Sequence, residues 1–300
     1  MTKELANVEV RPARAEDKEA VLAFCQHTWE NKEDYIHLVW NKWITDPTGR
    51  LFVAVVNGLP VAMERVVLMS EHEAWWEGLR IDPRYRGQGL VGVLRPHLEQ
   101  YLQEAGISIS RTCISSENRI MQGIMARRDR KRVGRYTSYK ADSIDSPLTQ
   151  LVQLTDDDFD AAWKRVISKN FFTGEQCLYI QRGAKWQELT TQQLSDRIEA
   201  GLVWGLKQGT QVLSLAIQSY LEGSNQMLWV GYANGTAESL PILLHELRLL
   251  AHHQEYLAIS GIFPLCDFVI ESLNIAGYER TEEQEYWVYE WSLVPAVCEG

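Results

Sequence analysis

The chain has 300 residues, of which 45% are apolar, and its formal net charge is -10 at neutral pH. This length and apolar content suffice for two ordinary hydrophobic cores, so we expect two domains. Nucleic acid and anionic membrane surfaces attract basic proteins, so an acidic chain is poorly suited to either. We therefore expect no nucleic acid or membrane partner, predict a small-molecule substrate, and leave homodimerisation open.

The cysteines and the N-terminus indicate a reducing compartment. Residues 1–5 lack the apolar stretch of a secretory signal, and no apolar run approaches the roughly 18 residues of a membrane span. We expect a soluble, cytoplasmic protein. The scattered cysteines form no CxxC pair, which predicts reduced thiols and no metal site. We expect the cysteines to be buried and to pack as small apolar side chains, and the alternative is that one of them is a nucleophile. The cysteines are Cys25, Cys113, Cys177, Cys266 and Cys298.

The first half of the chain predicts the order β-α-α-β-β-β-α-β-α-β. Its clearest signal is Asn57-Gly58 between two apolar runs, which indicates a β-hairpin. Helices are read from apolar residues at helical spacing, as at Val21, Leu22 and Cys25. We expect strands over 8–11, 51–56, 59–69, 74–81, 107–114 and 134–140, and helices opening at Ala15 and spanning 32–44, 90–104 and 118–126.

The second half repeats this order of elements, although the two halves share little residue identity. A turn-rich segment from Ser143 to Pro147 separates the halves. We therefore predict domains over 1–142 and 149–300, joined by a linker over 143–148. The expected strands span 151–154, 201–206, 212–220, 227–232, 256–262 and 285–292, and the expected helices open at 155 and span 238–253 and 267–275.

A glycine-rich turn, Arg84-Tyr85-Arg86-Gly87-Gln88-Gly89, lies between a predicted strand and a predicted helix. The first N–H groups of a helix have no partner within it, so such a turn can bind a pyrophosphate against the helix dipole. Glycines allow the phosphates to approach the backbone. The alternative is an ordinary strand-to-helix turn. The matching turn of the second half, Ala233 to Glu238, has one glycine and an acidic residue, so we expect it to bind no such ligand.

Together, the element order and this turn resemble the GNAT acetyltransferase superfamily. The resemblance implies an α/β fold with a mixed sheet, built as tandem GNAT-like domains of which the second is degenerate. It also implies acetyl-CoA as the cosubstrate in the first domain, without a metal. The residues that it assigns to acetyl-CoA are Leu79, Arg80, Ile81, Arg84, Tyr85, Arg86, Gly87, Gln88, Gly89, Leu90 and Asn118.

Acyl transfer needs a base for the amine and an acid for the leaving thiolate. By its place in the family pattern we favour Glu77 as the base, because apolar neighbours at Trp75 and Trp76 would strengthen it, with Glu64 as second choice. Interstrand ion pairs are the alternative role for both. Gly78 predicts a bulge in the strand, or a tolerated small residue. The family's helical tyrosine has no match, since Arg130 takes its place, and Tyr136 is the remaining acid candidate.

Residues 8 to 100 resemble the vertebrate histidine N-acetyltransferase family more closely. The shared residues are Asp34-Tyr35, Trp43 to Pro47, and Glu77-Gly78-Leu79-Arg80 with Arg86-Gly87. This resemblance implies a free amino acid or similar amine as the acceptor. We expect Arg65, Arg80 or Arg111 to bind its carboxylate. Tyr35, with Trp40 and Trp43, would line the pocket or belong to the core.

The sequence thus predicts an N-acetyltransferase acting on a small-molecule amine, with direct transfer in a ternary complex. A non-catalytic acetyl-CoA sensor is the alternative, because the helical tyrosine is missing. A basic run between Arg127 and Arg135 would contact the 3′-phosphate of the coenzyme or the second domain, or form a solvated helix end.

Overall fold

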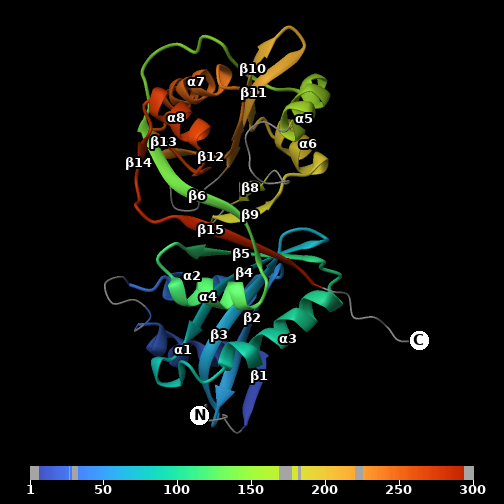
Figure 1. The fold of residues 1–300 in the computed structure, drawn as a ribbon, viewed down its shortest axis with the longest axis vertical. Helices are drawn as coiled ribbons and strands as arrows, with labels where there is room; N and C mark the ends of the chain where they lie inside the picture. The colour runs from blue at the N-terminus through green and yellow to red at the C-terminus, as the bar shows by residue number, and fades with distance from the viewer. Residues whose placement is uncertain are drawn as a thin grey trace, which may run out of the picture. The chain divides into compact units, whose positions relative to one another are not determined.

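The computed structural model of the chain describes residues 7–26, 28, 33–168, 178–181, 184–219 and 226–293. It divides into two compact units. The first unit contains residues 1–112 together with 290–300, and the second unit contains residues 113–289. Figure 1 labels the helices and strands of both units. Within the described ranges, no helix combines the length and the apolar character needed to cross a membrane.

The first unit is a sheet with helices on both faces. Its strands run in the order β1-β2-β3-β4-β5, and only the pair β4–β5 is parallel. The strands are β1 (Val8–Pro12), β2 (Gly49–Val56), β3 (Leu59–Leu68), β4 (Glu73–Ile81) and β5 (Ile109–Ser115), of which the last ends in the second unit. The helices are η1 (Ala15–Asp17), α1 (Lys18–Cys25), α2 (Ile36–Thr45), η2 (Pro83–Tyr85) and α3 (Leu90–Glu104).

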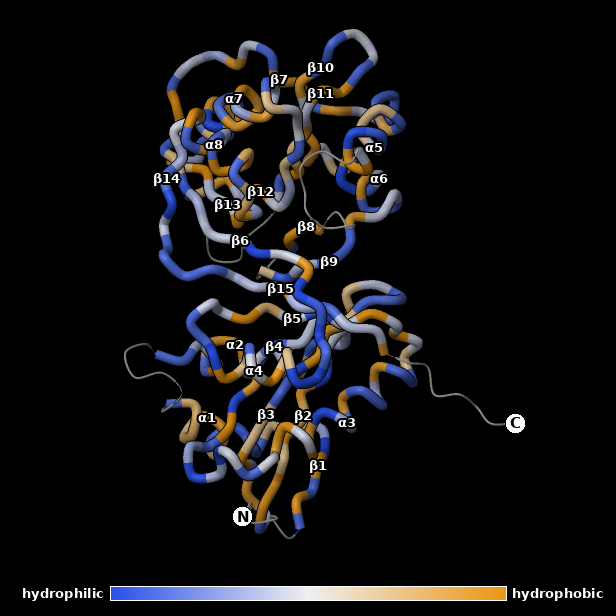
Figure 2. Tube along the Cα trace, viewed as in Figure 1, coloured by the Kyte–Doolittle hydropathy of each residue, from blue (hydrophilic) through white to orange (hydrophobic). Residues whose placement is uncertain are grey.

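Both faces of this sheet are apolar, because both are covered. Successive side chains of a strand point to opposite faces. In β2, Phe52 and Ala54 pack with α3, whereas Leu51 and Val53 pack with α1 and α2. Figure 2 shows β2 and β3 as largely hydrophobic along their length. Buried charged residues interrupt this apolar pattern on two neighbouring strands, with Glu64 and Arg65 on β3 and Arg80 on β4.

The last strand of the chain, β15 (Tyr286–Ser292), contributes its final residues to the first unit. The rings of Trp291 and Trp76 lie 5.5 Å apart, and Leu293 N donates to Ser108 O at 2.8 Å. Glu290 accepts from Arg111 Nε at 2.7 Å. The predicted boundary at residue 142 therefore differs from the observed division. The first unit recruits a strand from the far end of the sequence because that strand fills its core.

The second unit also has a mixed sheet, with the order β15-β6-β13-β12-β11-β10-β7. Strands β12 and β13 pair in parallel, as β4 and β5 do in the first unit. Its strands are β6 (Lys131–Asp142), β7 (Leu151–Gln153), β8 (Leu178–Gln181), β9 (Lys185–Glu188), β10 (Val203–Gln208), β11 (Gln211–Ser219), β12 (Met227–Asn234), β13 (Ala258–Pro264) and β14 (Glu279–Arg280). Its helices are α4 (Arg119–Arg127), η3 (Asp156–Asp158), α5 (Phe159–Ile167), α6 (Thr191–Glu199), α7 (Ser239–His253) and α8 (Asp267–Ile275).

Most predicted elements are confirmed, and α3 and α8 have the predicted bounds. The hairpin turn has Asn57 at φ 51° and Gly58 at φ 80°, which is the left-handed geometry of the favoured hairpin turn. We predicted no elements where β8, β9 and α6 lie. Strand β6 begins at Lys131, so half of the basic run belongs to a strand rather than to a helix end.

Several predictions concern residues outside the described ranges. These are the N-terminal segment 1–5, the start of a helix at Lys32, the end of a strand at Tyr220, and the thiols of Cys177 and Cys298. The other three cysteines are free. Burial raises the pKa of Cys25 to about 12, so its thiol stays protonated at neutral pH.

Replacing Trp291 by alanine should destabilise the first unit. This is expected although Trp291 lies more than 170 positions after residue 112, where the main segment of that unit ends. The side chain is buried against Trp76, and removing a core tryptophan costs about 3–5 kcal/mol. Hydrogen exchange should show α3 and β5 losing protection first. Unchanged protection in α3 would contradict the assignment of β15 to this core. Trp291→Phe is the control, since it keeps an aromatic ring.

Candidate active site

The glycine turn of the first unit has a backbone that only glycine adopts readily. Gly87 has φ 73° and Gly89 has φ 82°, both in the left-handed region. Gly89 is the N-cap of α3, a helix of 15 residues. The turn therefore ends directly at the helix, where the first N–H groups have no partner within the helix. The predicted strand–turn–helix placement of this segment is confirmed.

The turn faces open space. A Cβ placed at Gly87 or Gly89 would meet no heavy atom within 4 Å. A phosphate could therefore approach the backbone of both residues, as a pyrophosphate-binding turn requires. The side chain of Leu90 is buried among core residues, so only its backbone faces the turn. The residues thus fit the diphosphate of acetyl-CoA.

The arginines of the turn stabilise its shape. Arg84 Nη2 lies 2.6 Å from Asp82 Oδ2, and Arg84 N donates to Asp82 Oδ1 at 2.9 Å. Gln88 Nε2 donates to Arg84 O at 2.9 Å, and Arg86 Nε donates to Ile81 O at 3.3 Å. The guanidinium of Arg84 is exposed. Its positive charge is partly balanced by Asp82, which leaves the backbone as the main element that would hold an anion.

Strand β4 has a bulge at Gly78, as predicted. Met63 pairs with Arg80 and Arg65 pairs with Glu77, so Gly78 and Leu79 both lie opposite Glu64. Gly78 has φ 71°, and a Cβ there would lie 2.7 Å from the Trp43 ring. The register of β4 with β5 covers only Glu73 to Trp76. The bulge therefore falls beyond the last β4–β5 pair, where the backbone of β4 no longer pairs in register with β5.

The predicted base Glu77 is in an ion pair with Arg65, which was the alternative that we kept for it. Arg65 is buried, with 1% of its side chain exposed, and its other terminal nitrogen contacts Asp46. Glu77 is 14% exposed. We expected Glu77 to be buried between Trp75 and Trp76, but Trp76 lies on the opposite face of the sheet. Trp76 packs in the core with α3, because neighbouring residues of a strand point to opposite faces.

The second predicted base, Glu64, lies on the opposite face of the sheet. Its carboxylate accepts from Arg95 Nη2 at 2.7 Å and from Arg95 Nε at 3.1 Å, and both side chains are buried. This bidentate pair joins β3 to α3 in the core. A base needs access to its substrate, so Glu64 is the weaker candidate.

The arginines that we expected to bind an acceptor carboxylate already have carboxylate partners. Arg80 Nε donates to Asp34 Oδ2 at 2.6 Å and Nη2 donates to Asp34 Oδ1 at 3.2 Å. Burial would raise the pKa of Asp34, but the Arg80 guanidinium outweighs this effect and lowers it. Arg111 donates to Glu73 at 2.6 Å and to Glu290 at 2.7 Å. Asp34 comes from the segment before α2, whereas Glu73 and Glu290 lie on β4 and β15. The role of these arginines toward an acceptor carboxylate stays a prediction.

Aromatic rings connect these ion pairs on the α2 face of the sheet. The Arg65 guanidinium lies 5.0 Å from the Trp43 ring centre, and the Arg80 guanidinium lies 5.3 Å from that of Tyr35. The rings of Tyr35 and Trp43 meet edge to face at 6.1 Å. Sequence reasoning missed Asp34 and Asp46 as members of this cluster. The predicted helix over 32–44 ended just before Asp46, and this prediction carried no information about Arg65.

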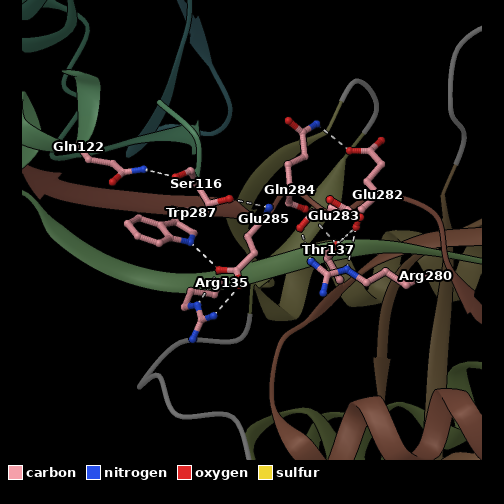
Figure 3. A network of polar contacts seen from close by, with 10 residues as sticks. All are labelled: Ser116, Gln122, Arg135, Thr137, Arg280, Glu282, Glu283, Gln284, Glu285 and Trp287. Carbon is pink, nitrogen blue, oxygen red and sulfur yellow. Dashed lines mark hydrogen bonds and ion pairs between the residues drawn. The ribbon is translucent and has the colours of Figure 1, made fainter. Parts of the chain in front are cut away.

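The remaining predicted residues lie in the second unit. Tyr136 is buried, 5.3 Å from the Trp186 ring, and Asn118 caps α4 by accepting from Met121 N at 3.1 Å. Arg135, from the basic run, pairs with Glu285 at 2.6 Å, and Trp287 donates to the same carboxylate. Figure 3 shows this network within the second unit. Their predicted roles toward acetyl-CoA stay predictions.

The corresponding turn of the second unit differs from the glycine turn. Thr236 N donates to Ser239 Oγ at 2.9 Å and Ser239 N donates to Thr236 Oγ1 at 3.2 Å, so the chain satisfies its own helix start. A Cβ at Gly235 would lie 2.8 Å from Ser214 Cβ. A Cβ at Gly231 would lie 2.7 Å from Ile180 O, because β8 packs against β12 there. These contacts leave no open glycine turn at this position.

Comparison with known proteins agrees with this geometry. Residues 15–128 match the Acetyltransferase (GNAT) family. The chain is 30% identical over 90 residues to histidine N-acetyltransferase of Oreochromis niloticus and 32% identical over 81 residues to probable N-acetyltransferase 16 of Homo sapiens. These alignments cover 30% and 26% of the chain. They span 26% and 22% of the two relatives, so the chain matches only about a quarter of their length.

Solved structures resemble the whole chain. A GCN5-related N-acetyltransferase from Sphaerobacter thermophilus has a TM-score of 0.61 at 13% identity, covering 96% of each chain. A tandem GNAT protein from the clavulanic acid biosynthesis pathway has a TM-score of 0.54 at 12% identity, covering 97% of this chain and all of that one. At such identities the likeness concerns the fold, and it confirms the predicted tandem GNAT-like architecture. The glycine turn and the bulged strand thus both lie within the segment 15–128, the part of the chain that matches the Acetyltransferase (GNAT) family.

Proposed function

We propose that the chain is an N-acetyltransferase that moves the acetyl group of acetyl-CoA to the amine of a small molecule. The observation that carries the proposal is the open glycine turn at the start of α3, with the bulge of β4 just before it. Acetyl-CoA supplies the activated thioester. The backbone of Gly87, Gln88, Gly89 and Leu90 would hold its diphosphate, and β4 beyond Gly78 would bind its pantetheine arm.

Direct transfer within a ternary complex is the simplest course. The neutral acceptor nitrogen forms a C–N bond to the acetyl carbon and the C–S bond breaks. The leaving thiolate takes a proton from the acid, and the proton that the nitrogen loses as it becomes an amide replaces it. Glu77 would accept the proton of the acceptor ammonium, since it is partly exposed beside the bulge. An amino acid such as histidine is the acceptor favoured by the similarity to histidine N-acetyltransferase. Tyr136 is the predicted acid.

An acetyl-CoA sensor without turnover is the second candidate. The observation in its favour is that α4, Arg119–Arg127, contains no tyrosine. The two functions differ in free-thiol release. Purified protein should release thiol from acetyl-CoA with at least one member of a panel of amino acids and polyamines. Stabilisation by coenzyme A without release from any amine would instead support the sensor, and failure to bind coenzyme A would refute both.

Gly89→Asp should abolish binding of coenzyme A. The new carboxylate would repel the diphosphate, while the fold persists because the Cβ at this position has open space. Gly89→Asn is the matched control, because asparagine has nearly the same shape, is neutral and tolerates the left-handed backbone. Calorimetry should give an affinity at least about tenfold lower for aspartate than for asparagine. Equal affinities would exclude a diphosphate at this turn.

Glu77→Gln should lower kcat at neutral pH by about a hundredfold or more, as expected on loss of a general base. The KM for acetyl-CoA should change little, because Glu77 lies outside the glycine turn. Steady-state kinetics with the best acceptor from the panel measure both constants. If kcat is unchanged, the base lies elsewhere, and Glu64→Gln becomes the next variant to measure.

A further inference from the structure

Arg65 contacts two carboxylates at once, and they come from different parts of the first unit. Its Nη1 contacts Glu77 on β4 and its Nη2 contacts Asp46 in the connection from α2 to β2. The guanidinium lies against the Trp43 ring. Gly49 also contributes, because a Cβ there would lie 2.2 Å from Arg65 Nη2. The cation is thus enclosed by an aromatic ring, a glycine backbone and two acids.

Asp46 is held in place independently of Arg65. Its Oδ1 accepts from Thr48 N at 2.9 Å and from Thr48 Oγ1 at 2.7 Å. Burial would raise the pKa of Asp46, but the bonds from Thr48 and the charge of Arg65 lower it overall. Asp46 therefore stays ionised at neutral pH and is a permanent partner of Arg65.

Arg65 needs a second carboxylate partner if Glu77 acts as a base. When a base takes a proton from an ammonium group, its own negative charge is lost. If Glu77 were the sole partner of Arg65, this step would leave a buried guanidinium without a counter-charge, at a cost of several kcal/mol. With Asp46 also bound, the guanidinium keeps a counter-charge in both protonation states of Glu77.

We propose that Asp46 and Arg65 are positioning residues that allow Glu77 to act as a base. Arg65 orients the Glu77 carboxylate, and Asp46 keeps Arg65 neutralised when Glu77 accepts the proton of the acceptor ammonium. Arg65 and Asp46 exchange no proton in this step. The proposal rests on the proposed function for the role of Glu77, and it assigns a role to the Trp43–Pro47 segment.

The other charged and titratable groups near Glu77 keep a constant charge around neutral pH. Arg80, on the same strand, is paired with Asp34, and the ring of Tyr35 lies against Arg80. Cys25, from α1, has a thiol whose pKa is raised to about 12 by burial. None of these groups changes its charge near neutral pH. The negative charge that neutralises the Arg65 guanidinium therefore comes from Asp46 and Glu77.

The test is the pH dependence of the Asp46→Asn variant. Removing the charge of Asp46 should make protonation of Glu77 less favourable, so the acidic limb of the pH–kcat profile should move to lower pH by about one unit or more. At neutral pH kcat should fall about tenfold, because a weaker base accelerates proton transfer less. The KM for acetyl-CoA should stay within about twofold of the parent value. Asp46→Glu, which keeps the charge, should restore the profile.

Controls separate this role from general damage to the fold. Glu16→Gln removes one exposed negative charge from the same unit and should leave the profile where it is. Thermal unfolding shows whether Asp46→Asn is folded, and Asp46→Glu remains informative if it is not. A profile of folded Asp46→Asn that coincides with the parent profile would overturn the proposal, as would an Asp46→Glu profile displaced to lower pH.

A second measurement does not need turnover. In protein with isotope-labelled glutamate, the Glu77 carboxyl resonance can be assigned by its loss in Glu77→Gln and titrated by NMR. Its midpoint should be lower in Asp46→Asn than in the parent. Equal midpoints would refute the influence of Asp46. A lower midpoint in a protein that acetylates no amine would refute the proposed function and leave the electrostatic link between Asp46 and Glu77 standing.

Discussion

The buried guanidinium of Arg65 is the interaction on which the α2 face of the first unit depends. A charge with 1% exposure must be paired, and it is paired by one acid from β4 and one from the α2–β2 connection. This requirement ties the end of α2 to the strand that carries the bulge. It also explains why Gly49 and Gly78 are glycines, since side chains there would meet Arg65 and Trp43.

The bulge of β4 and the glycine turn follow each other along the chain. Gly78 shifts the register of β4 against β3, and Gly87 and Gly89 open the start of α3 nine and eleven residues further along. The second unit has a similar parallel strand pair, but its helix start is capped by Thr236 and Ser239. The two units thus share a fold, and at this position the described residues of the first unit alone form an open glycine turn.

The polar residues of the first unit divide between its two faces by strand alternation. Glu64 and Arg95 form a bidentate pair on the α3 face, whereas Arg65 and Glu77 lie on the α2 face. Adjacent residues of β3 therefore have different roles. Both members of the first pair are buried in the core, whereas in the second pair Glu77 keeps 14% of its side chain exposed and only Arg65 is fully buried.

The sequence by itself determined the local features. Helix α3, the Asn57-Gly58 hairpin, the bulge at Gly78 and the glycine turn each depend on a few neighbouring residues whose backbone preferences are strong. Tertiary structure alone decided the partners of the charged residues. Asp46 and Arg65, or Arg111 and Glu290, are far apart in the chain, and many pairings satisfy the same charges. The recruitment of β15 by the first unit is likewise a matter of packing, because a large aromatic residue such as Trp291 fits many cores, and its contact with Trp76 exists only in the folded unit.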